Sequence, residues 1–209
     1  MILYSYWRST TSLRVRAALN LKGIAYETRP VNLLDGAQKA PDYAALNPVE
    51  GVPTLILDDG TVLTQSMAIL DWLEETYPEP ALLPADPVHR AMVRAAAQVI
   101  ALEIHPVNNL KVGAALKARG FDQQAVVDWM CHWMDKGFAA YQRLILSEGR
   151  FSFGDTPTQA DLCLVGQMVN ARRWGLDLAP FARLVEIDEA ARALPQIAAA
   201  LPENQPDAQ

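Results

Sequence analysis

Hydrophobic and polar residues alternate in two different ways along the chain. Near the amino terminus, strand-like patterns over Ile2–Tyr6 and Ala25–Val31 lie on either side of a segment with the helical period. Two further β-rich segments, Thr54–Leu57 and Val62–Thr64, flank Asp58-Asp59-Gly60, which is typical of a hairpin turn. This order predicts a small α/β unit.

Beyond residue 80 the pattern is helical. Prolines between residues 77 and 87 interrupt regular structure and predict a linker. Apolar residues with the helical period then fill four segments, which are His89–Leu116, Asp122–Leu146, Thr158–Arg173 and Phe181–Ala191. We therefore expect an α/β domain over residues 1–80, an all-helical domain over residues 88–209, and a frayed polar tail from Pro202 to Gln209.

Two of the predicted helices begin with hydroxyl residues that suit an N-cap. Ser66 precedes a helix predicted over Met67–Tyr77. Thr158 and Asp161 match a capping box, with Asp in the usual place of Glu. We interpret Asp161 as a folding device and assign it no catalytic role.

Composition favours a soluble globular protein. Of the 209 residues, 51% are hydrophobic, the formal net charge is −6, and no apolar run is long enough to span a bilayer. Met1 leads directly into a strand without the pattern of a signal peptide, so we expect a cytoplasmic protein with no membrane partner. Lysine and arginine form no basic stripe, which argues against nucleic acid as a partner. Cys131 and Cys163 lie in apolar helical segments and are expected to be buried free thiols, and no residues cluster as metal ligands.

The most informative polar cluster lies where the first strand meets the first helix, in the run Arg8-Ser9-Thr10-Thr11-Ser12. The first turn of a helix presents unpaired N–H groups and a partial positive charge. A hydroxyl there can therefore help to hold an anion such as a thiolate. The alternative is that these residues only cap the helix, which is the commoner role of Ser and Thr.

A second candidate binding element is Val52-Pro53, which comes just before a predicted strand. Proline removes a hydrogen-bond donor and turns the chain sharply when its peptide bond is cis. The Val52 backbone is then expected to be free to bind an extended peptide as an added strand. The alternative is an ordinary edge strand protected by a proline. The helix start near Ser66 offers a second set of N–H groups for a carboxylate.

These features occur together in one family. A strand, a hydroxyl-rich helix start, Val52-Pro53 and Gln65-Ser66, in this order, resemble the thioredoxin-like domain of cytosolic glutathione transferases. Within that family the chain resembles the zeta class over nearly its whole length. The matching segments are Tyr4–Ser9, Ser12–Leu19, Leu21–Glu27, Ala45–Pro48, Leu73–Pro78, Leu82–Pro84, His105–Leu110 and Asp161–Val165.

The resemblance implies the cytosolic glutathione transferase fold, with an N-terminal thioredoxin-like domain and a C-terminal helical bundle. It also implies glutathione as a cofactor, a homodimer, and cis–trans isomerisation of maleylacetoacetate. In that reaction the glutathione thiolate adds reversibly to an activated double bond, rotation follows, and the thiolate leaves.

Site residues follow by position from the same resemblance. Ser9 matches the essential serine that donates to the sulfur and lowers the thiol pKa, and Thr10 and Thr11 line the same turn. Glutathione is expected to contact Gln38, Val52, Pro53, Gln65, Ser66, His105 and Asn109. Without the family match, a lone histidine such as His105 before a proline is more often a capping or packing residue.

The substrate implied by the resemblance is a small anionic dicarboxylate. Through residue 80 the chain carries six cations against ten anions, and after it twelve against fourteen, so bulk charge does not attract this substrate. Attraction must come from a local cationic pocket. Arg8 and Arg173 are the family-matched candidates, Lys111 is a weaker one, and Arg172 is expected to be an ordinary charge at a helix end.

The sequence is also compatible with other activities. Related maleylpyruvate isomerases share Thr11 and His105-Pro106 but can carry arginine where Leu110 stands here, which favours maleylacetoacetate. The common family pattern has cysteine at the position of Thr11, and a threonine cannot form the mixed disulfide that reductive dehalogenation requires. A transferase acting on α-haloacids or other small electrophiles, and a non-catalytic binding protein of the same fold, are the remaining alternatives.

Overall fold

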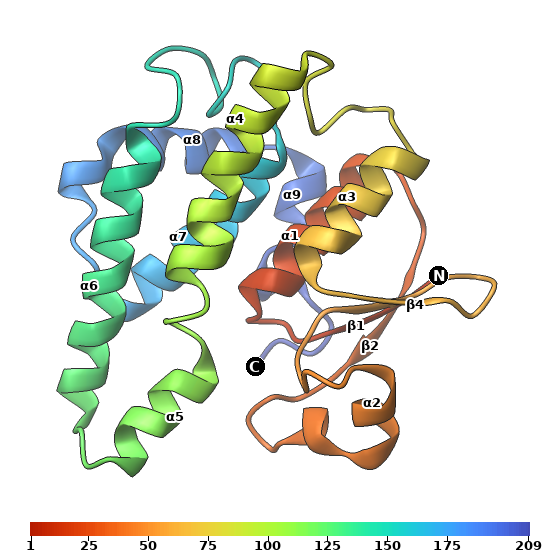
Figure 1. Cartoon of the computed structure of the whole chain (residues 1–209), viewed down its shortest axis with the longest axis vertical. Coiled ribbons are helices and arrows are strands. Elements are labelled where there is room, and N and C mark those ends of the chain that lie inside the picture. The colour runs from red at the N-terminus through yellow and green to blue at the C-terminus, as the bar shows by residue number, and fades with distance from the viewer. The chain divides into compact units, whose positions relative to one another are not determined.

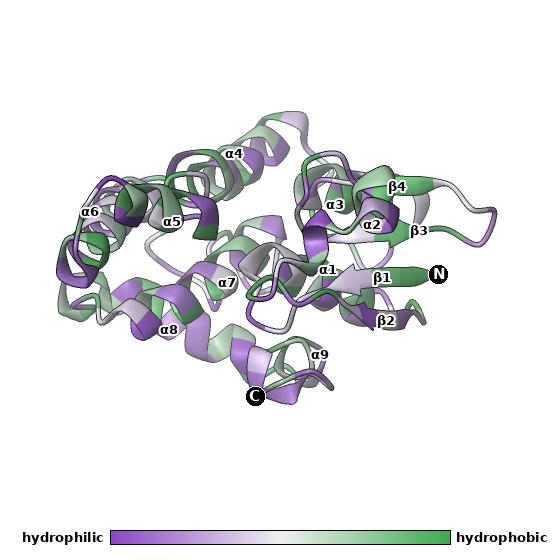
Figure 2. Cartoon of the chain, turned by 90° about the horizontal axis from the view of Figure 1, so that it is seen from below, coloured by the Kyte–Doolittle hydropathy of each residue, from purple (hydrophilic) through white to green (hydrophobic).

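In the computed structural model, which describes all 209 residues, four short strands form one mixed sheet. They are β1 (Ile2–Ser5), β2 (Glu27–Pro30), β3 (Thr54–Ile56) and β4 (Val62–Thr64), arranged in the order β2-β1-β3-β4. β1 is parallel to β2 and antiparallel to β3, and β3 and β4 form the predicted hairpin. In Figure 2 the edge strand β2 is hydrophilic, whereas β3 and β4 are hydrophobic. The sheet therefore presents its most polar strand at an edge.

Helices cover both faces of this sheet. Figure 1 shows α1 (Thr10–Leu21) and α3 (Ser66–Thr76) on one side, and α2 (Pro41–Leu46) on the other. The turn η1 (Ala37–Lys39) precedes α2. Leu13, Val15 and Leu19 of α1 are fully or almost fully buried, which explains why the apolar period of this segment forms a helix against the sheet.

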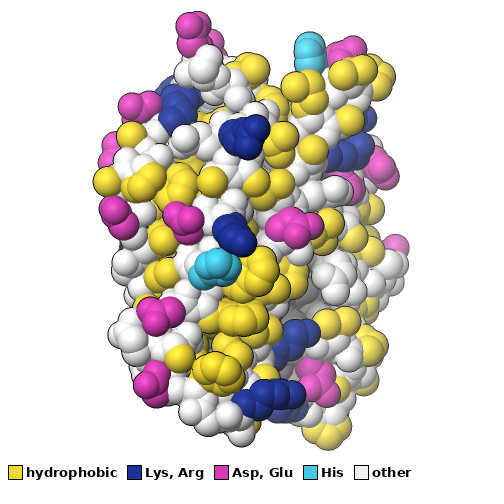
Figure 3. All heavy atoms as spheres, turned by 60° about the vertical axis from the view of Figure 1, so that its left-hand side comes forward, with side chains coloured by type: hydrophobic (Ala, Val, Ile, Leu, Met, Phe, Trp, Pro, Cys, Tyr) yellow, Lys and Arg dark blue, Asp and Glu magenta, His cyan; other side chains and the backbone are white.

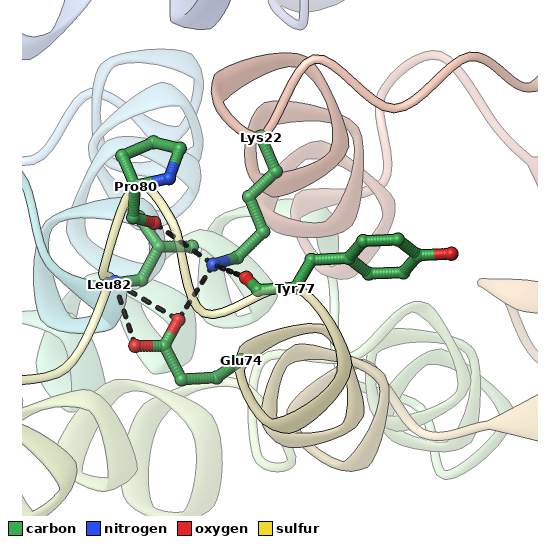
Figure 4. Close-up of polar contacts among 5 residues, drawn as sticks. All are labelled: Lys22, Glu74, Tyr77, Pro80 and Leu82. Carbon is green, nitrogen blue, oxygen red and sulfur yellow. Dashed lines mark hydrogen bonds and ion pairs between the residues drawn. The ribbon is translucent and has the colours of Figure 1, made fainter.

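A buried ion pair fixes the carboxyl end of α3 (Figure 4). The ammonium of Lys22, whose side chain has no exposed surface, lies 2.8 Å from Glu74 Oε2. It also donates to the backbone carbonyls of Tyr77 at 2.6 Å and Pro80 at 3.0 Å. The Leu82 N–H donates to both carboxylate oxygens of Glu74, at 3.0 Å each. All three ammonium protons are thus used, and the segment after α3 is tied to the end of α1.

The chain divides into two units. Unit 1 comprises Met1–Leu82 together with Arg192–Gln209, and unit 2 comprises Leu83–Ala191. The division after Leu82 falls within the proline-rich segment where a linker is predicted. The carboxyl-terminal segment, however, packs with unit 1, whereas the sequence pattern groups it with the helical residues 88–209. It contains α9 (Pro195–Ala198) and the turn η4 (Pro202–Asn204).

The prediction of a frayed tail is wrong. Gln205 is only 9% exposed, and its amide donates to the carbonyls of Ala199 at 2.8 Å and Leu201 at 2.9 Å. The Asn204 amide donates to the Ala198 carbonyl at 2.8 Å. Polar side chains in the tail satisfy the carbonyls at the end of α9, an arrangement that composition alone does not reveal.

Unit 2 is helical. Its elements are α4 (Pro87–Gln98), the π-helical turn η2 (Val99–Ile104), α5 (Leu110–Ala118), α6 (Gln123–Gln142), α7 (Gln159–Trp174), the turn η3 (Ala179–Phe181) and α8 (Ala182–Arg192). α7 is buried along most of its length. Thr158 and Asp161 form the predicted capping box at its start. No helix of the chain has the length and hydrophobicity that a membrane span requires.

The sequence predicts one helical segment over His89–Leu116, and the structure breaks it. The π-helical turn ends at Ile104, and α5 begins only at Leu110. Pro106 has no N–H to continue a helix, and the Asn109 side chain accepts from the Lys111 N–H at 3.1 Å and so caps a new one. A correction also applies to α3, because Gln65 is its N-cap and Ser66 is its first residue.

Candidate active site

Ser9 occupies the N-cap of α1. Its backbone is extended, with φ −69° and ψ 119°, and its Oγ accepts from the Ser12 N–H at 3.1 Å. The first turn contains no acidic residue. The capping role considered from the sequence is therefore real, and the hydroxyl stands at the positive end of the helix.

Thr11 links Ser9 to Val52. Its hydroxyl donates to the Val52 carbonyl at 2.8 Å, and its Oγ1 lies 2.8 Å from Ser9 Oγ. Because the single Thr11 proton goes to Val52, Ser9 is the donor of the bond between the two hydroxyls. The expectation of a free Val52 backbone is thus wrong for the carbonyl. Thr10, by contrast, is buried, at 4% exposed.

Two side chains, Tyr43 and Asn47, hold the loop that carries Val52. The Val52–Pro53 peptide bond is cis. Tyr43 Oη donates to the Gly51 carbonyl at 2.5 Å, and the Asn47 amide donates to the same carbonyl at 2.9 Å. Burial raises the pKa of Tyr43, which keeps this phenol a donor. Sequence reasoning did not assign these two supporting side chains, although Asn47-Pro48 was part of the resemblance.

A third feature lies at the start of α3. Gln65 has a positive φ of 66°, which is strained for a residue with a side chain, and its side chain makes no capping bond. The Gln65 side chain therefore does not satisfy the N–H groups of the first turn of α3. Arg14 Nη1 lies 3.5 Å from Ser66 Oγ, and Arg14 is 1% exposed with Nε and Nη2 lacking any hydrogen-bond partner. A buried cation and an uncapped helix start thus meet at one place, which suits a carboxylate.

Sequence reasoning missed Arg14. The available signal was two arginines, Arg14 and Arg16, in a helical run from Leu13 to Leu19 that is otherwise apolar, where a charge is unexpected unless it serves a partner.

Two other predicted residues of unit 1 stand apart from this group. Gln38 lies in η1, and its amide oxygen is buried without a hydrogen-bond partner. The Arg8 guanidinium stacks 4.9 Å from the centroid of the Trp7 ring, and its Nε is buried without a partner. Arg8 pairs with no carboxylate, so its charge is available to an anion.

In unit 2, three predicted residues gather at the start of α5. The Asn109 amide lies 3.4 Å from His105 Nε2, and Asn109 caps the helix through the Lys111 N–H. Arg173 lies near the carboxyl end of α7 and stacks 5.0 Å from the Trp174 ring. Arg172 pairs with the buried Asp188 at 2.6 Å, so its charge serves the fold through an ion pair that the sequence did not predict.

The remaining charges and thiols add no further cluster. On the face shown in Figure 3, Lys and Arg side chains are scattered among acidic and hydrophobic ones. Cys131 and Cys163 are free thiols, as predicted, but Cys131 is only half-buried, and burial together with Asp128 raises its pKa. No group of His, Cys, Asp and Glu side chains is arranged to hold a metal ion.

Known proteins share both the sequence and the fold of this chain. Residues 8–76 match the family model of the glutathione S-transferase N-terminal domain. The maleylacetoacetate isomerase of Pseudomonas aeruginosa is 45% identical, over 99% of this chain and 98% of that protein. The holo structure of a bacterial maleylpyruvate isomerase, a zeta-class glutathione S-transferase, is 45% identical and superposes with a TM-score of 0.97 over 100% of both chains.

A third relative was solved with ligands. The maleylacetoacetate isomerase of Methylobacterium extorquens AM1, with malonate and glutathione bound, is 39% identical and has a TM-score of 0.95 over 100% of both chains. These similarities confirm the expected architecture, a thioredoxin-like N-terminal domain followed by a helical C-terminal region.

Proposed function

The chain belongs to the zeta-class glutathione transferases, and on that premise we propose that it converts maleylacetoacetate to fumarylacetoacetate. It is a glutathione-dependent isomerase of this class. The observation that carries the proposal is the Ser9 hydroxyl at the start of α1, joined through Thr11 to the Val52 carbonyl. We assign most glutathione contacts to residues 1–80, with His105 and Asn109 added from residues 88–209, and we assign the substrate site to Arg8 together with residues of 88–209.

The residues present fit glutathione, which is a tripeptide with a thiol and two carboxylates. The uncapped start of α3, with Ser66 and the partnerless N–H groups of Arg14, provides donors and positive charge for the γ-glutamyl carboxylate. Val52 and Pro53 provide a backbone edge for the central residue. Gln38, whose amide oxygen has no hydrogen-bond partner, is the proposed contact of the glycine end, where this oxygen can accept from the glycyl N–H.

When bound, glutathione supplies the thiolate that adds to the cis double bond and leaves after rotation about the resulting single bond. Ser9 lowers the pKa of the thiol, because its hydroxyl donates and the N–H groups of α1 add positive potential. For this, Ser9 must turn its proton away from Thr11. Thr11 bonds to both Ser9 and the Val52 carbonyl and so fixes their separation, and Thr10 is buried.

The substrate carboxylates are assigned to cationic side chains. Arg8 is the first candidate, because it is stacked on Trp7 and carries no competing acid. Arg173 and Lys111 follow from the family match, and His105 and Asn109 are assigned to glutathione on the same basis. Bound malonate in the Methylobacterium relative agrees with a site that accepts dicarboxylates.

The test follows loss of the cis-enone absorbance of maleylacetone, with and without glutathione. The wild-type protein should isomerise it only with glutathione, whose concentration stays constant. Ser9→Ala should lower kcat by about 100-fold, as removal of an oriented donor does elsewhere. Isomerisation without glutathione, or unchanged turnover by Ser9→Ala, would refute the assignment.

Ser9 also caps α1, so its variants need controls. Ser9→Asp retains a good N-cap but lacks the hydroxyl and places a negative charge beside the thiolate, and it should be folded and inactive. Asp86→Ala removes the cap of α4, which accepts from Val88 and His89, and should cost about 1 kcal/mol of stability without loss of turnover. Together they separate capping from chemistry.

The substrate is tested by comparing kcat/KM for maleylacetoacetate and maleylpyruvate. We expect the former to be preferred, because Leu110, which is 50% exposed, provides no cation. Leu110→Arg should shift the ratio toward maleylpyruvate. Preference of the wild-type protein for maleylpyruvate would replace the assignment, and consumption of glutathione on α-haloacids would favour the transferase alternative.

We also propose that the protein acts in the cytoplasm as a homodimer, in the degradation of tyrosine. The support is the family resemblance. Light scattering on the purified protein tests the dimer, and growth of a deletion strain on tyrosine tests the pathway.

A further inference from the structure

A fully buried arginine joins the catalytic turn to the carboxyl-terminal segment. Arg16 of α1 is 0% exposed. Its Nη1 donates to Ser5 Oγ at 2.8 Å and to the Tyr6 carbonyl at 3.3 Å, and its Nη2 donates to the Trp7 carbonyl at 3.1 Å. Nε and Nη2 also donate to the Ala200 carbonyl, at 3.1 Å and 2.9 Å. One guanidinium thus binds the end of β1, the turn before Ser9, and Ala200, which is 184 positions away.

The tail also binds the same turn directly. The Trp7 N–H donates to Asp207 Oδ2 at 3.1 Å. Both backbone polar groups of Trp7 are therefore fixed, one by Arg16 and the other by Asp207. The Ser9 N–H donates to the Tyr6 carbonyl at 2.9 Å, so the position of Ser9 depends on the same turn. Figure 1 shows the carboxyl end of the chain beside the loop that precedes α1.

Charge favours this arrangement. Burial lowers the pKa of Arg16 to about 10, so the side chain remains protonated near neutral pH, and nearby Asp207 and Tyr26 favour its charged form. Asp207 is half-buried, and the turn that carries it is held by Gln205. The acceptor of the Trp7 N–H is thus held in place by the fold.

We propose that Asp207 is a positioning residue of the active site, which orients the Ser9 hydroxyl toward the cofactor thiol by fixing the Trp7 N–H. The inference rests on the proposed role of Ser9. The carboxyl-terminal segment thereby has a part in catalysis, although it lies about 200 positions from Ser9 in the sequence and contains no recognisable catalytic motif.

The experiment compares Asp207→Ala and Asp207→Asn with Glu203→Ala. Glu203 is an acidic residue of the same segment that pairs with Arg192 at 3.2 Å, so its replacement removes an acidic side chain and one contact of the tail but leaves Trp7 bound. Asp207→Ala should lower kcat by about tenfold, since small misplacements of catalytic groups have effects of this size or larger. KM for glutathione should change less than twofold, because the predicted binding residues are untouched.

Two further readouts distinguish positioning from a structural role. Ultraviolet titration of the bound thiolate should give a higher thiol pKa in Asp207→Ala than in wild type. Hydrogen exchange of the free protein should be faster over residues 6–9 in Asp207→Ala, while the core strands remain protected. Asp207→Asn retains an acceptor for the Trp7 N–H and should stay near wild type in all three measurements, as should Glu203→Ala.

The outcomes are decisive. Unchanged exchange at residues 6–9 together with unchanged kcat in Asp207→Ala would overturn the inference, as would an Asp207→Asn variant that is as impaired as Asp207→Ala. A general loss of unfolding stability with no change in thiol pKa would mean that the tail only stabilises the fold. Failure of wild-type isomerisation would refute the proposed function instead, and the exchange measurement would still report on the turn.

Discussion

The starts of α1 and α7 both carry hydroxyl-rich sequences, yet only α7 has a capping box, in which a carboxylate of its own first turn bonds back to the cap. We call the start of α7 closed and that of α1 open. At α7, Asp161 accepts from the Ser152 N–H at 2.8 Å, the Thr158 N–H at 2.7 Å and the Thr158 hydroxyl at 2.8 Å. At α1, the residue equivalent to Asp161 is Ser12, and Ser9 accepts only from its N–H. The difference is an acid three residues after the cap.

This difference supports a structural role for the start of α7 and the proposed catalytic role for the start of α1. A carboxylate at α7 satisfies the donors and neutralises the positive end of the helix. Without a carboxylate, α1 keeps its positive potential for a bound anion. A hydroxyl before a helix is therefore informative about function only when the first turn contains no acid of its own.

The largest effect on stability should follow from removing the carboxylate at the start of α7. Asp161→Ala leaves three buried donors without an acceptor and should reduce the free energy of unfolding by about 4 kcal/mol. Urea unfolding measures this loss, and kcat of the folded fraction should be unchanged. The matched control is Asp122→Ala at the exposed cap of α6, which should cost only about 1 kcal/mol. Equal losses in the two variants would show that burial of the cap at α7 does not matter.

Much of the fold was predictable because it depends on local patterns. The hairpin followed from Asp58-Asp59-Gly60, and the capping box from the spacing of Thr158 and Asp161. The hydroxyl-rich helix start at Ser9 was recognisable because a helix N-cap is a local property, whereas the catalytic role of Ser9 is a proposal that came from the family resemblance. The break at residues 105–109 was missed, since the apolar period continues through it and only Pro106 signals the interruption.

Long-range contacts of polar residues could not be predicted. Lysine is usually a surface residue, but Lys22 is buried against Glu74. It also donates to the carbonyls of Tyr77 and Pro80, which follow α3. Arg16 and Asp207 are joined to Trp7 from opposite ends of the chain. Such contacts depend on the three-dimensional arrangement of whole elements, so periodicity contains no information about them.

The start of α3 combines two sources of positive charge, the helix end itself and the guanidinium of Arg14 beside Ser66. Arg14→Met removes the charge but keeps a long side chain, and should weaken glutathione binding by about tenfold, the loss of one bond to a charged group. Because Nε and Nη2 have no partner, and Nη1 makes long contacts of 3.5 Å to Ser66 Oγ and Met67 Sδ, stability should not fall. Isothermal titration with glutathione and thermal unfolding measure the two effects. The exposed Arg119→Met is the control for charge. A stability loss equal to the binding loss would instead assign Arg14 to the core.

The smallest effect on turnover should come from replacing Thr11, whose hydroxyl holds Ser9 at the open start of α1. Thr11→Val keeps the shape of the side chain but removes the bonds to Ser9 and to the Val52 carbonyl. We expect kcat to fall by about fivefold, because the hydroxyl of Ser9 loses its reference point while its own donor remains. Thr28→Val on β2 is the control for the same substitution outside the site. If Thr11→Val were instead as inactive as Ser9→Ala, the threonine would itself donate to the sulfur, and the open start of α1 would hold two catalytic hydroxyls.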